Sequence, residues 1–316
     1  MRPFADGLGQ RCSPIIEFAG RVRRATRVRD GGARLQAKAR GKIVAEVETF
    51  HEFERRGWSA ESVVLGYHDS FSGITTQAVA PLLDAAAAKP GGKVLDVACG
   101  AGYAAAAAAE RGCSATGVDF SPTQVALAAR LHPTLVFCEG DASALPFGAD
   151  EFDAVVSNFG IPHFPDPQAF LREAFRVLRR GGRVAVSAWT NPDPRLGFGV
   201  LYAAVQKHGR VDVPIPTGPN FFPFGDTAQC ERALLEAGFT PIAITTPPVI
   251  YRMATPETFL DAAMKGTVRG AALLAAQRPE ALAAIRGAMR EAIGGYARDG
   301  AFELPMPTIV AAGEKL

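Results

Sequence analysis

Hydrophobic positions in the middle of the chain come in short runs that alternate with alanine-rich or amphipathic segments. An apolar run at 94–98 leads into Gly100 and Gly102, and six consecutive alanines follow at 104–109. Short runs rich in Val and Leu suit buried strands, and alanine has the highest helix propensity of all residues. The stretch therefore predicts a strand, a glycine loop and a helix.

The same alternation continues as far as Trp189. It predicts further strands at 115–119, 135–139, 152–157 and 183–188, and helices at 122–131 and 168–178. Strands that alternate with helices are typical of a parallel sheet with crossover helices. The predicted fold class is therefore α/β.

Helical patterns flank this region on both sides. Apolar residues spaced through a charged stretch from about residue 44, and an amphipathic segment at 76–88, predict a helical cap before it. After Trp189 the composition shifts to Pro, Gly and Phe, which is typical of a lid or binding loop. Beyond this loop we expect a helix at 227–237 capped by Thr227, helices at 256–264 and 279–296, and strands at 242–251 and 308–312.

Acidic residues stand at the ends of the first three predicted strands at a regular spacing. Asp119 follows Asp96 by 23 residues, and Asp141 follows Asp119 by 22. In an open parallel sheet the carboxyl ends of the strands lie along one edge, and ligands bind in the crevice there. We therefore expect the three carboxylates to face a single crevice.

The glycine loop is compatible with two classes of ligand. Dinucleotide pyrophosphates are bound by G-x-G-x-x-G, whose third glycine allows close packing of the helix. Here Ala105 occupies the third position and Asp96 precedes the glycines, which favours a ligand without phosphate. An NAD(P)-dependent oxidoreductase remains an alternative, because alanine is tolerated at that position.

Five motifs in the core form an ordered series: VLDVACGAG at 94–102, GVDFSPTQ at 117–124, GDASALPF at 140–147, DEFDAVVSNFGIPHF at 150–164 and LREAFRVLRRGGRVAVSAW at 171–189. In their order and spacing they resemble the class I S-adenosylmethionine (SAM) dependent methyltransferases. The similarity is to the ubiquinone and menaquinone C-methyltransferase group, or methyltransferase type 11. Two positions depart from the family pattern, because Ala98 replaces a glycine and Gln124 stands where methionine is frequent.

The resemblance implies a Rossmann-like, mostly parallel sheet of seven strands with an antiparallel last strand, an N-terminal helical cap and a lid insertion. It implies four parts of the chain: a basic extension at 1–45, the cap at 46–90, a SAM-binding core at 91–189, and a lid, helical insertion and closing strands of the same domain at 190–316. It also implies SAM as the cofactor and S-adenosylhomocysteine as its product.

One part of the expected site holds the methionine half of SAM. Gly100 and Gly102 lack side chains, so the loop backbone can approach the ligand and point its amides at the carboxylate. Asp96 would order this loop or hold the methionine ammonium, and Ala98 belongs to the same loop. A tight turn between a strand and a helix is the alternative explanation of the two glycines.

A second part binds the adenosine half. Asp119, at the end of the second strand, would accept hydrogen bonds from both ribose hydroxyls. Asp141 and Ala142 resemble the pair that recognises adenine, the carboxylate accepting from the exocyclic amine and the backbone N–H donating to a ring nitrogen. Phe120 and Gln124 would flank the ring.

The reaction centre is expected after the fourth strand of the core. Asn158 and Phe159 stand where SAM and the acceptor would meet, and Tyr67 resembles an N-terminal tyrosine that closes over SAM in this family. His163 is the best candidate for a catalytic acid or base, because imidazole titrates near neutral pH. The alternative for His163 is a loop histidine bonded to backbone, and the alternative for Tyr67 is an aromatic residue of the cap core.

Nucleic-acid bases are disfavoured as acceptors. Enzymes that methylate exocyclic amines of bases have N-P-P-Y or D-P-P-Y after the fourth strand, whereas this chain has Asn158-Phe159-Gly160-Ile161. The nucleophilic cysteine that cytosine C5 enzymes place after a proline in this region is also missing. We therefore expect a small-molecule acceptor.

Composition sets further expectations. The five cysteines show neither a C-x-x-C pair nor zinc-ligand spacing with histidine, so reduced thiols without a metal are expected. No stretch approaches the roughly 18 apolar residues of a membrane span, and no signal-peptide pattern occurs. We therefore expect a cytoplasmic protein; the sequence specifies no oligomeric state.

Positive charge is concentrated at the N-terminus. Residues 1–42 carry eleven Lys or Arg against three Asp or Glu, whereas the net charge of the whole chain is +2. Such a segment can bind nucleic acid or an anionic membrane, act as a transit segment, or be a solvated extension. We expect the solvated extension and assign it no function.

Together these patterns predict in-line transfer of a methyl group from SAM to a small molecule. The Phe-rich loop at 219–225 and Phe164 favour an apolar or aromatic acceptor, since pockets for such compounds are lined in this way. An NAD(P)-dependent oxidoreductase and a SAM-binding protein without transferase activity are the alternatives.

Overall fold

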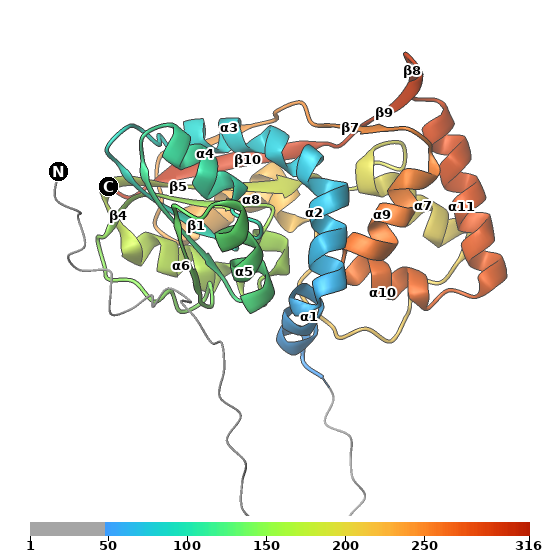
Figure 1. Ribbon diagram of the computed structural model, residues 1–316, viewed down its shortest axis with the longest axis horizontal. Coiled ribbons are helices and arrows are strands. Elements are labelled where there is room, and N and C mark those ends of the chain that lie inside the picture. The colour runs from blue at the N-terminus through green and yellow to red at the C-terminus, as the bar shows by residue number, and fades with distance from the viewer. Residues whose placement is uncertain (1–47) are drawn as a thin grey trace, which may run out of the picture.

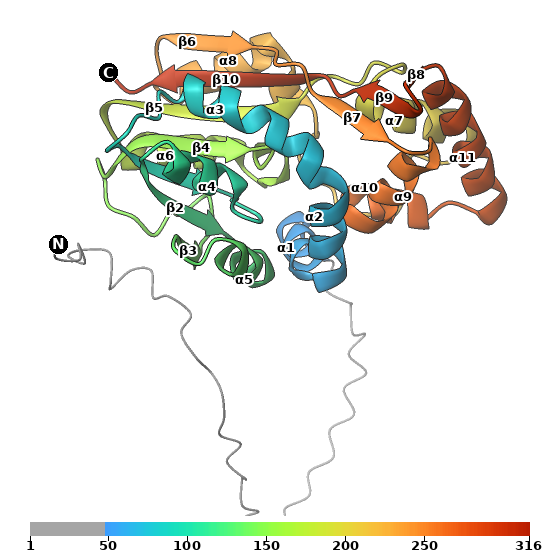
Figure 2. The same cartoon turned by 45° about the horizontal axis from the view of Figure 1, so that its top comes forward.

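The fold is built on one open sheet of seven strands. The computed structural model describes residues 48–316, so the basic extension expected at 1–45 lies outside the described residues. The order across the sheet is β3-β2-β1-β4-β5-β10-β6. Figure 2 shows these strands side by side: β1 (Lys93–Val97), β2 (Ser114–Asp119), β3 (Val136–Glu139), β4 (Phe152–Asn158), β5 (Leu178–Trp189), β6 (Ile242–Thr245) and β10 (Thr308–Glu314).

All strands of this sheet except β10 run in the same direction. The pairs β2–β3, β1–β2, β1–β4 and β4–β5 are parallel, whereas β10 is antiparallel to both β5 and β6. This confirms the Rossmann-like sheet with an antiparallel last strand. The carboxyl ends of β1, β2, β3 and β4 therefore lie along one edge, which is the arrangement expected for the three strand-end acids.

Helices cover both faces of the sheet, which explains why its strands are apolar on both sides. One face carries α3, α4 and α5, and the alanines of α4 allow close packing against β1 and β2. The other face carries α6 and α8. Their bounds are α3 (Val79–Ala85), α4 (Tyr103–Glu110), α5 (Pro122–Leu131), α6 (Pro167–Val177) and α8 (Thr227–Glu236). Within residues 48–316, no helix combines the length and the apolar character that crossing a membrane requires.

Two helices precede the sheet. Helix α1 (Phe50–Ser59) begins at a capping box, in which the Glu52 N–H donates to Thr49 Oγ1 and the Thr49 N–H donates to the Glu52 carboxylate. Helix α2 (Glu61–Thr75) follows and packs against α9 (Glu257–Gly266). In Figure 1, α2 stands between the sheet and the C-terminal helices. A short 3-10 turn, η1 (Thr76–Ala78), connects α2 to α3, so the helix expected at 76–88 begins as a 3-10 turn.

A smaller unit lies on the far side of α2 from the sheet (Figure 1). It has a core of aromatic and aliphatic side chains that continues onto α2. Its strands form a separate sheet in the order β7-β9-β8. The elements are α7 (Gly197–His208), α9, α10 (Arg269–Ala275), α11 (Pro279–Gly294), β7 (Ile250–Met253), β8 (Ala297–Arg298) and β9 (Ala301–Pro305).

The structure corrects three details of the sequence-based prediction. The strand expected at 242–251 is divided, because Pro247 and Pro248 lack the N–H groups that a sheet needs, and β7 joins the smaller sheet instead. The region expected to be a lid loop contains α7. The cap of α8 is Asp226 rather than Thr227, since the Asp226 side chain accepts a hydrogen bond from the Gln229 N–H.

Gly102 shapes the loop between β1 and α4. It is the N-cap of α4 and has a φ of 81°, a left-handed conformation that residues with a Cβ rarely adopt. A Cβ at this position would lie 2.7 Å from the Phe137 ring and 3.1 Å from the His132 ring. Both the backbone conformation and the packing therefore require glycine here.

We predict that Gly102→Ala lowers the free energy of unfolding more than Gly181→Ala. Gly181 has a similar φ of 78°, but a Cβ there meets no atom within 4 Å. The Gly181 substitution should cost about 1 kcal/mol for the left-handed backbone alone. The Gly102 substitution should cost about 2–4 kcal/mol, because overpacking adds to that strain. Urea denaturation measures both values, and equal losses would show that the Phe137 contact does not constrain the loop.

Candidate active site

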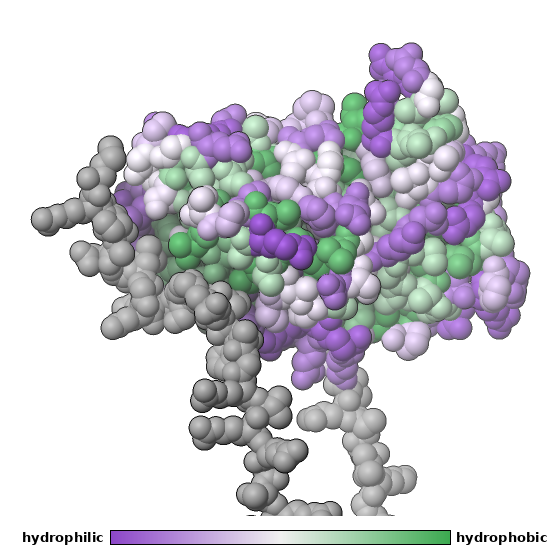
Figure 3. Space-filling view, in the orientation of Figure 1, coloured by the Kyte–Doolittle hydropathy of each residue, from purple (hydrophilic) through white to green (hydrophobic). Residues whose placement is uncertain are grey.

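A deep cavity opens at the carboxyl ends of β1, β2 and β4. The space between its walls, together with the open solvent at its mouth, measures about 1150 Å³, and we call it the sheet-edge cavity. Figure 3 shows hydrophobic residues at the surface between α4 and α2, two of the helices that contribute to its wall. All predicted site residues except Gly102 line it: Tyr67, Asp96, Ala98, Gly100, Asp119, Phe120, Gln124, Asp141, Ala142, Asn158, Phe159 and His163. Gly102 is not part of the lining and packs behind the loop against Phe137.

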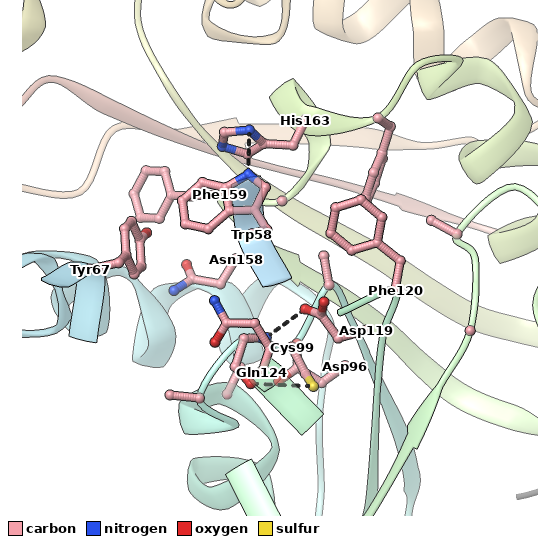
Figure 4. Close-up of a pocket in the computed structure, with 18 of the residues that line it drawn as sticks. Trp58, Tyr67, Asp96, Cys99, Asp119, Phe120, Gln124, Asn158, Phe159 and His163 are labelled. Carbon is pink, nitrogen blue, oxygen red and sulfur yellow. Dashed lines mark hydrogen bonds between the residues drawn. The ribbon is translucent and has the colours of Figure 1, made fainter. Parts of the chain in front are cut away.

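Asp119 is buried at one end of this cavity (Figure 4). Its carboxylate accepts hydrogen bonds from the Gly100 N–H and the Ser121 N–H, both at 2.9 Å. Burial raises the pKa of the Asp119 carboxyl to about 6, although these two donors act in the opposite direction. A carboxylate has about four lone-pair sites, so Asp119 retains capacity for further donors.

Asp96 lies beneath the glycine loop. Its Oδ2 accepts a hydrogen bond from the Ala105 N–H at 3.0 Å, which ties β1 to the first turn of α4. Its Oδ1 is buried and has no hydrogen-bond partner among the residues that the structure describes. Burial raises the pKa of Asp96 to about 7, with the Ala105 N–H acting against this and the nearby Asp119 charge adding to it. A buried carboxylate oxygen in this position requires a donor or a proton.

The third strand-end acid lies at the opening of the cavity. The Asp141 side chain is 42% exposed, and its Oδ1 accepts hydrogen bonds from the N–H and the hydroxyl of Ser143. Ala142 and Phe120 lie in the same part of the lining. Gln124 is buried on α5 and belongs to the same wall. Of the three strand-end acids, two are therefore buried and one faces solvent.

Two residues of the wall other than glycine have positive φ. Ala98 has a φ of 54°, in the region that favours glycine, which gives a physical reason for the glycine usual at this position. Phe159 has a φ of 57° and stacks on Trp189 with ring centroids 4.0 Å apart. The Phe159 N–H donates to Ser187 Oγ, whose hydroxyl donates to Asn158 Oδ1. These contacts hold the strained segment after β4 in one conformation.

The other end of the cavity is aromatic and contains His163. Figure 4 shows Trp58, Tyr67, Phe159 and His163 grouped there, away from the buried acids. The Trp58 ring packs edge-to-face against Tyr67 at 5.2 Å and against His163 at 5.0 Å. Burial raises the pKa of Tyr67 to about 12, so its phenol stays protonated at neutral pH.

A carboxylate on α1 holds this aromatic end together. Glu54 is fully buried and accepts hydrogen bonds from His163 Nδ1 at 2.8 Å, Trp58 Nε1 at 2.9 Å and Arg269 Nε at 2.9 Å. Burial alone would raise the pKa of Glu54, but His163 and Arg269 outweigh it and hold that pKa below its ordinary value. The carboxylate is therefore ionised and supplied with donors on both oxygens.

Arg269 on α10 extends these contacts to the loop after α7. Its guanidinium donates to the carbonyls of Pro162 at 2.9 Å and Pro219 at 3.0 Å. It also lies over the Phe50 ring, 4.4 Å from the centroid. Pro162 belongs to the 3-10 turn η2 (Ile161–His163). Helix α1, η2, α10 and the loop at Pro219 are thus joined through one ion pair.

A second cavity adjoins the aromatic end. The space between its walls, together with the open solvent at its mouth, measures about 650 Å³, and we call it the aromatic chamber. Trp58, Tyr67, Phe159 and His163 line both cavities. The remaining wall of the chamber is largely aromatic and aliphatic: Phe71, Trp189, Phe198, Leu201, Tyr202, Phe221, Ala263, Thr267, Val268, Arg269, Gly270 and Leu273. The four shared residues therefore form the junction between the two spaces.

Sequence reasoning missed the cluster around Glu54. Trp58 follows Glu54 by one helical turn, so their contact can be expected once α1 is accepted as a helix. Arg269 is 215 residues away from Glu54, and no local pattern links them. The pair His68 and Tyr103, hydrogen-bonded at 2.8 Å in the wall of the sheet-edge cavity, likewise joins two distant helices.

Cys99 is the cysteine nearest to the predicted site, and it lines the sheet-edge cavity. Burial raises the pKa of its thiol, so the group stays protonated and is a weak nucleophile. In the described part of the chain, no three His, Cys, Asp or Glu side chains are grouped as metal ligands would be.

Comparison with known sequences identifies the core. A family model described as a methyltransferase domain matches residues 95–186. A demethylmenaquinone methyltransferase of Beutenbergia cavernae is 42% identical over 120 residues, which cover 38% of this chain and 50% of that protein. One from Thermus thermophilus is 39% identical over 126 residues, or 38% of this chain and 57% of that protein. The chain thus spans about half the length of the curated relatives it matches.

Solved structures share the fold at low sequence identity. The YcgJ protein of Bacillus subtilis has a TM-score of 0.52 at 19% identity, covering 75% of this chain and 97% of that one. Phosphoethanolamine N-methyltransferase 2 of Haemonchus contortus, solved with SAM, has a TM-score of 0.53 at 21% identity, covering 85% and 60%. Residues 95–186, which carry the glycine loop and the strand-end acids, therefore match a methyltransferase domain and are similar to part of the demethylmenaquinone methyltransferases.

Proposed function

We propose that this chain transfers a methyl group from SAM to a small apolar or aromatic acceptor. The observation that carries the proposal is that the glycine loop, the strand-end acids and an aromatic wall with His163 all face one cavity of a methyltransferase domain. The family match favours SAM over the nicotinamide cofactor of the alternative oxidoreductase. We place the reaction in the cytoplasm and expect no resident metal.

The acidic end of the cavity fits the polar groups of SAM. Asp119 has lone pairs left for the two ribose hydroxyls. The buried Oδ1 of Asp96 lacks a donor, which the methionine ammonium would supply directly or through water. Asp141 and the Ala142 N–H would recognise adenine at the opening of the cavity, with Phe120 and Gln124 beside the ring.

When bound, SAM supplies a methyl group that its sulfonium already makes electrophilic. The task of the protein is therefore to align a nucleophile in line with that methyl at about 3 Å and to exclude water. Asn158 and Phe159 would fix the wall at this point, and Tyr67 would close over the cofactor. His163, at the junction of the two cavities, would take a proton from an acceptor that must lose one.

Methyl-labelled SAM tests the proposal directly. Purified protein, cell extract and labelled SAM should give a labelled small molecule, and Asp119→Ala should give none because it removes the ribose acceptor. Calorimetry with SAM and with NAD distinguishes a SAM-binding protein from the alternative NAD(P)-dependent oxidoreductase. If SAM binds but no extract gives a labelled product, the protein is a SAM-binding protein without transferase activity.

Cofactor binding should weaken in acid, since Asp119 accepts ribose hydrogen bonds best when ionised. Burial raises its pKa to about 6, so the dissociation constant of SAM should rise up to tenfold for each pH unit below about 6. Asp119→Asn should weaken binding at least tenfold at pH 8 and make this pH dependence shallower. Calorimetry between pH 5 and 8 measures both effects. If the wild type bound SAM equally well over this range, Asp119 would not be the group that binds the ribose.

Asp96→Asn should stabilise the cofactor-free protein at pH 8. The pKa of Asp96 is 3.8 in its ordinary state and about 7 when folded, so its contribution to stability is complete below about pH 4 and is lost as the pH rises to 7. A pKa shift of this size means that ionising the buried Asp96 carboxyl costs roughly 4 kcal/mol of folding stability. The asparagine of the variant avoids this cost, but its buried amide lacks a partner and has a smaller cost of its own. We therefore expect a net gain of about 2 kcal/mol in the free energy of unfolding.

Urea denaturation of Asp96→Asn and wild type at several pH values measures this difference. It should grow between pH 5 and 8, because only the wild type must ionise a buried carboxyl. The same variant should bind SAM more weakly. A difference that does not change with pH would show that Asp96 is not the group responsible.

A further inference from the structure

The wall of the aromatic chamber is built largely from aromatic rings. Phe198 belongs to this wall and contacts Phe71, Trp189 and Phe221 with ring centroids 6.1, 5.5 and 6.3 Å apart. Aromatic rings attract one another in offset-stacked and edge-to-face arrangements, so such a wall favours an aromatic ligand over an aliphatic one. Apart from the junction, the polar side chains of this wall are those of Tyr202, Thr267 and Arg269. The chamber therefore suits an aromatic compound with few polar groups.

The junction places one titratable group beside a molecule in the chamber. Of the four residues that line both cavities, Trp58 and Phe159 do not titrate, and burial keeps the Tyr67 phenol protonated. His163 is the remaining one, and its side chain is 21% exposed. A polar group at the cofactor end of an aromatic acceptor would therefore face the His163 imidazole.

Glu54 determines which nitrogen of that imidazole carries the hydrogen. An ionised carboxylate can only accept, so the 2.8 Å contact requires a hydrogen on His163 Nδ1. The indole N–H of Trp58 has two acceptors within reach, His163 Nδ1 at 3.3 Å (dashed in Figure 4) and Glu54 Oε2 at 2.9 Å. The ionised carboxylate is the nearer and stronger acceptor, so we assign the indole hydrogen to Glu54. The Nε2 of a neutral His163 is then an acceptor, and it has no hydrogen-bond partner among residues 48–316.

We propose that the methyl acceptor is a hydroxylated aromatic compound bound in the aromatic chamber, and that Glu54 is a positioning residue that keeps His163 Nε2 free to take the hydroxyl proton. This inference rests on the proposed methyltransferase function. The O–H bond of the acceptor breaks and its proton passes to Nε2. The phenolate oxygen then bonds to the methyl carbon while the carbon–sulfur bond breaks, and its electron pair stays on sulfur. The imidazolium returns its proton to water.

The charges around His163 are compatible with this role. Glu54 on α1 faces its Nδ1, and Asp119 at the end of β2 adds a second negative charge across the cavity. Arg269 on α10 balances Glu54 from the opposite side. An imidazolium formed during the reaction is thus stabilised by two carboxylates, while Arg269 keeps Glu54 ionised and in place.

Binding of a phenol to the chamber can be followed by intrinsic fluorescence. The chain has two tryptophans, Trp58 and Trp189, and both line the chamber. Because nitroaromatic compounds quench indole fluorescence, 4-nitrophenol should quench the emission of the SAM-bound protein along a saturable curve. Phe198→Ala should weaken this binding at least fivefold. Quenching that does not saturate would overturn the assignment of the chamber.

Glu54→Gln tests the positioning role, because its amide N–H can donate to Nδ1 and so move the hydrogen to Nε2. Nitrogen-15 NMR of histidine-labelled protein should place the hydrogen on Nδ1 of His163 in the wild type and on Nε2 in the variant. Methylation of 2-naphthol, which keeps its proton at neutral pH, should fall about 100-fold or more. Methylation of 4-nitrophenol at pH 8, where its hydroxyl is already ionised, should fall less than fivefold.

Controls separate this role from a structural one. Glu303→Gln changes another carboxylate that is paired with an arginine, Arg252. This variant should methylate both phenols at the rate of the wild type. If Glu54→Gln does not fold because Arg269 loses its counter-charge, the double variant Glu54→Gln with Arg269→Gln removes both charges, and Glu54→Asp should recover part of the 2-naphthol activity.

Three results would overturn the inference. The first is an equal loss of methylation rate for 2-naphthol and 4-nitrophenol in Glu54→Gln. The second is a hydrogen on His163 Nε2 in the wild type. The third is the absence of labelled product from either phenol although calorimetry shows that SAM binds. Failure of the proposed function has a different signature, because SAM would then not bind, or no cell extract would give a labelled product. The position of the hydrogen on His163 Nδ1, measured without SAM, would be unaffected.

Discussion

The packing of three distant segments around the two cavities depends on one buried carboxylate. Glu54 lies on helix α1, yet its donors include His163 of η2 and Arg269 of α10, near the other end of the chain. Breaking a buried ion pair by removing one partner typically costs about 3–5 kcal/mol. Because Trp58 and His163 line both cavities, the wall at their junction rests on this ion pair.

The buried acids of the sheet-edge cavity have the opposite effect on stability, because they destabilise the folded protein. Asp96 and Asp119 are held in a low-dielectric environment, and burial raises the pKa of both. In contrast to Glu54, neither has a cationic partner in its hydrogen-bonding set. The protein is therefore less stable without a ligand than its packing alone would allow. A cationic ligand with hydroxyl and ammonium donors, as proposed for SAM, would relieve this and would couple occupation of the site to the stability of the fold.

The sequence predicted the sheet and its acidic edge well because those features are local. Val- and Leu-rich runs ending in Asp96 and Asp119 determine both the strands and the position of the carboxylates, and a shared edge follows from parallel strands. The aromatic chamber could not be predicted in this way, since its walls come from α2, α7 and α10, which meet only through tertiary packing. The ion pair between Glu54 and Arg269 could not be predicted for the same reason, because its two residues meet only through tertiary packing. The division of the strand expected at 242–251 depended on Pro247 and Pro248, whose effect is local and could have been recognised.

The way the chain leaves the large sheet and returns to it has an evolutionary consequence. β6 and β10 are neighbours in that sheet, and Ile250 of β7 pairs with Pro305 of β9, so residues 246–307 depart and come back through adjacent positions. Segments whose ends lie together tolerate replacement without disturbing their host. A lineage could therefore exchange the α9–α11 wall, and with it the range of compounds accepted, while the cofactor edge keeps its register. The requirement on each replacement would be a new cation to take the place of Arg269 beside Glu54.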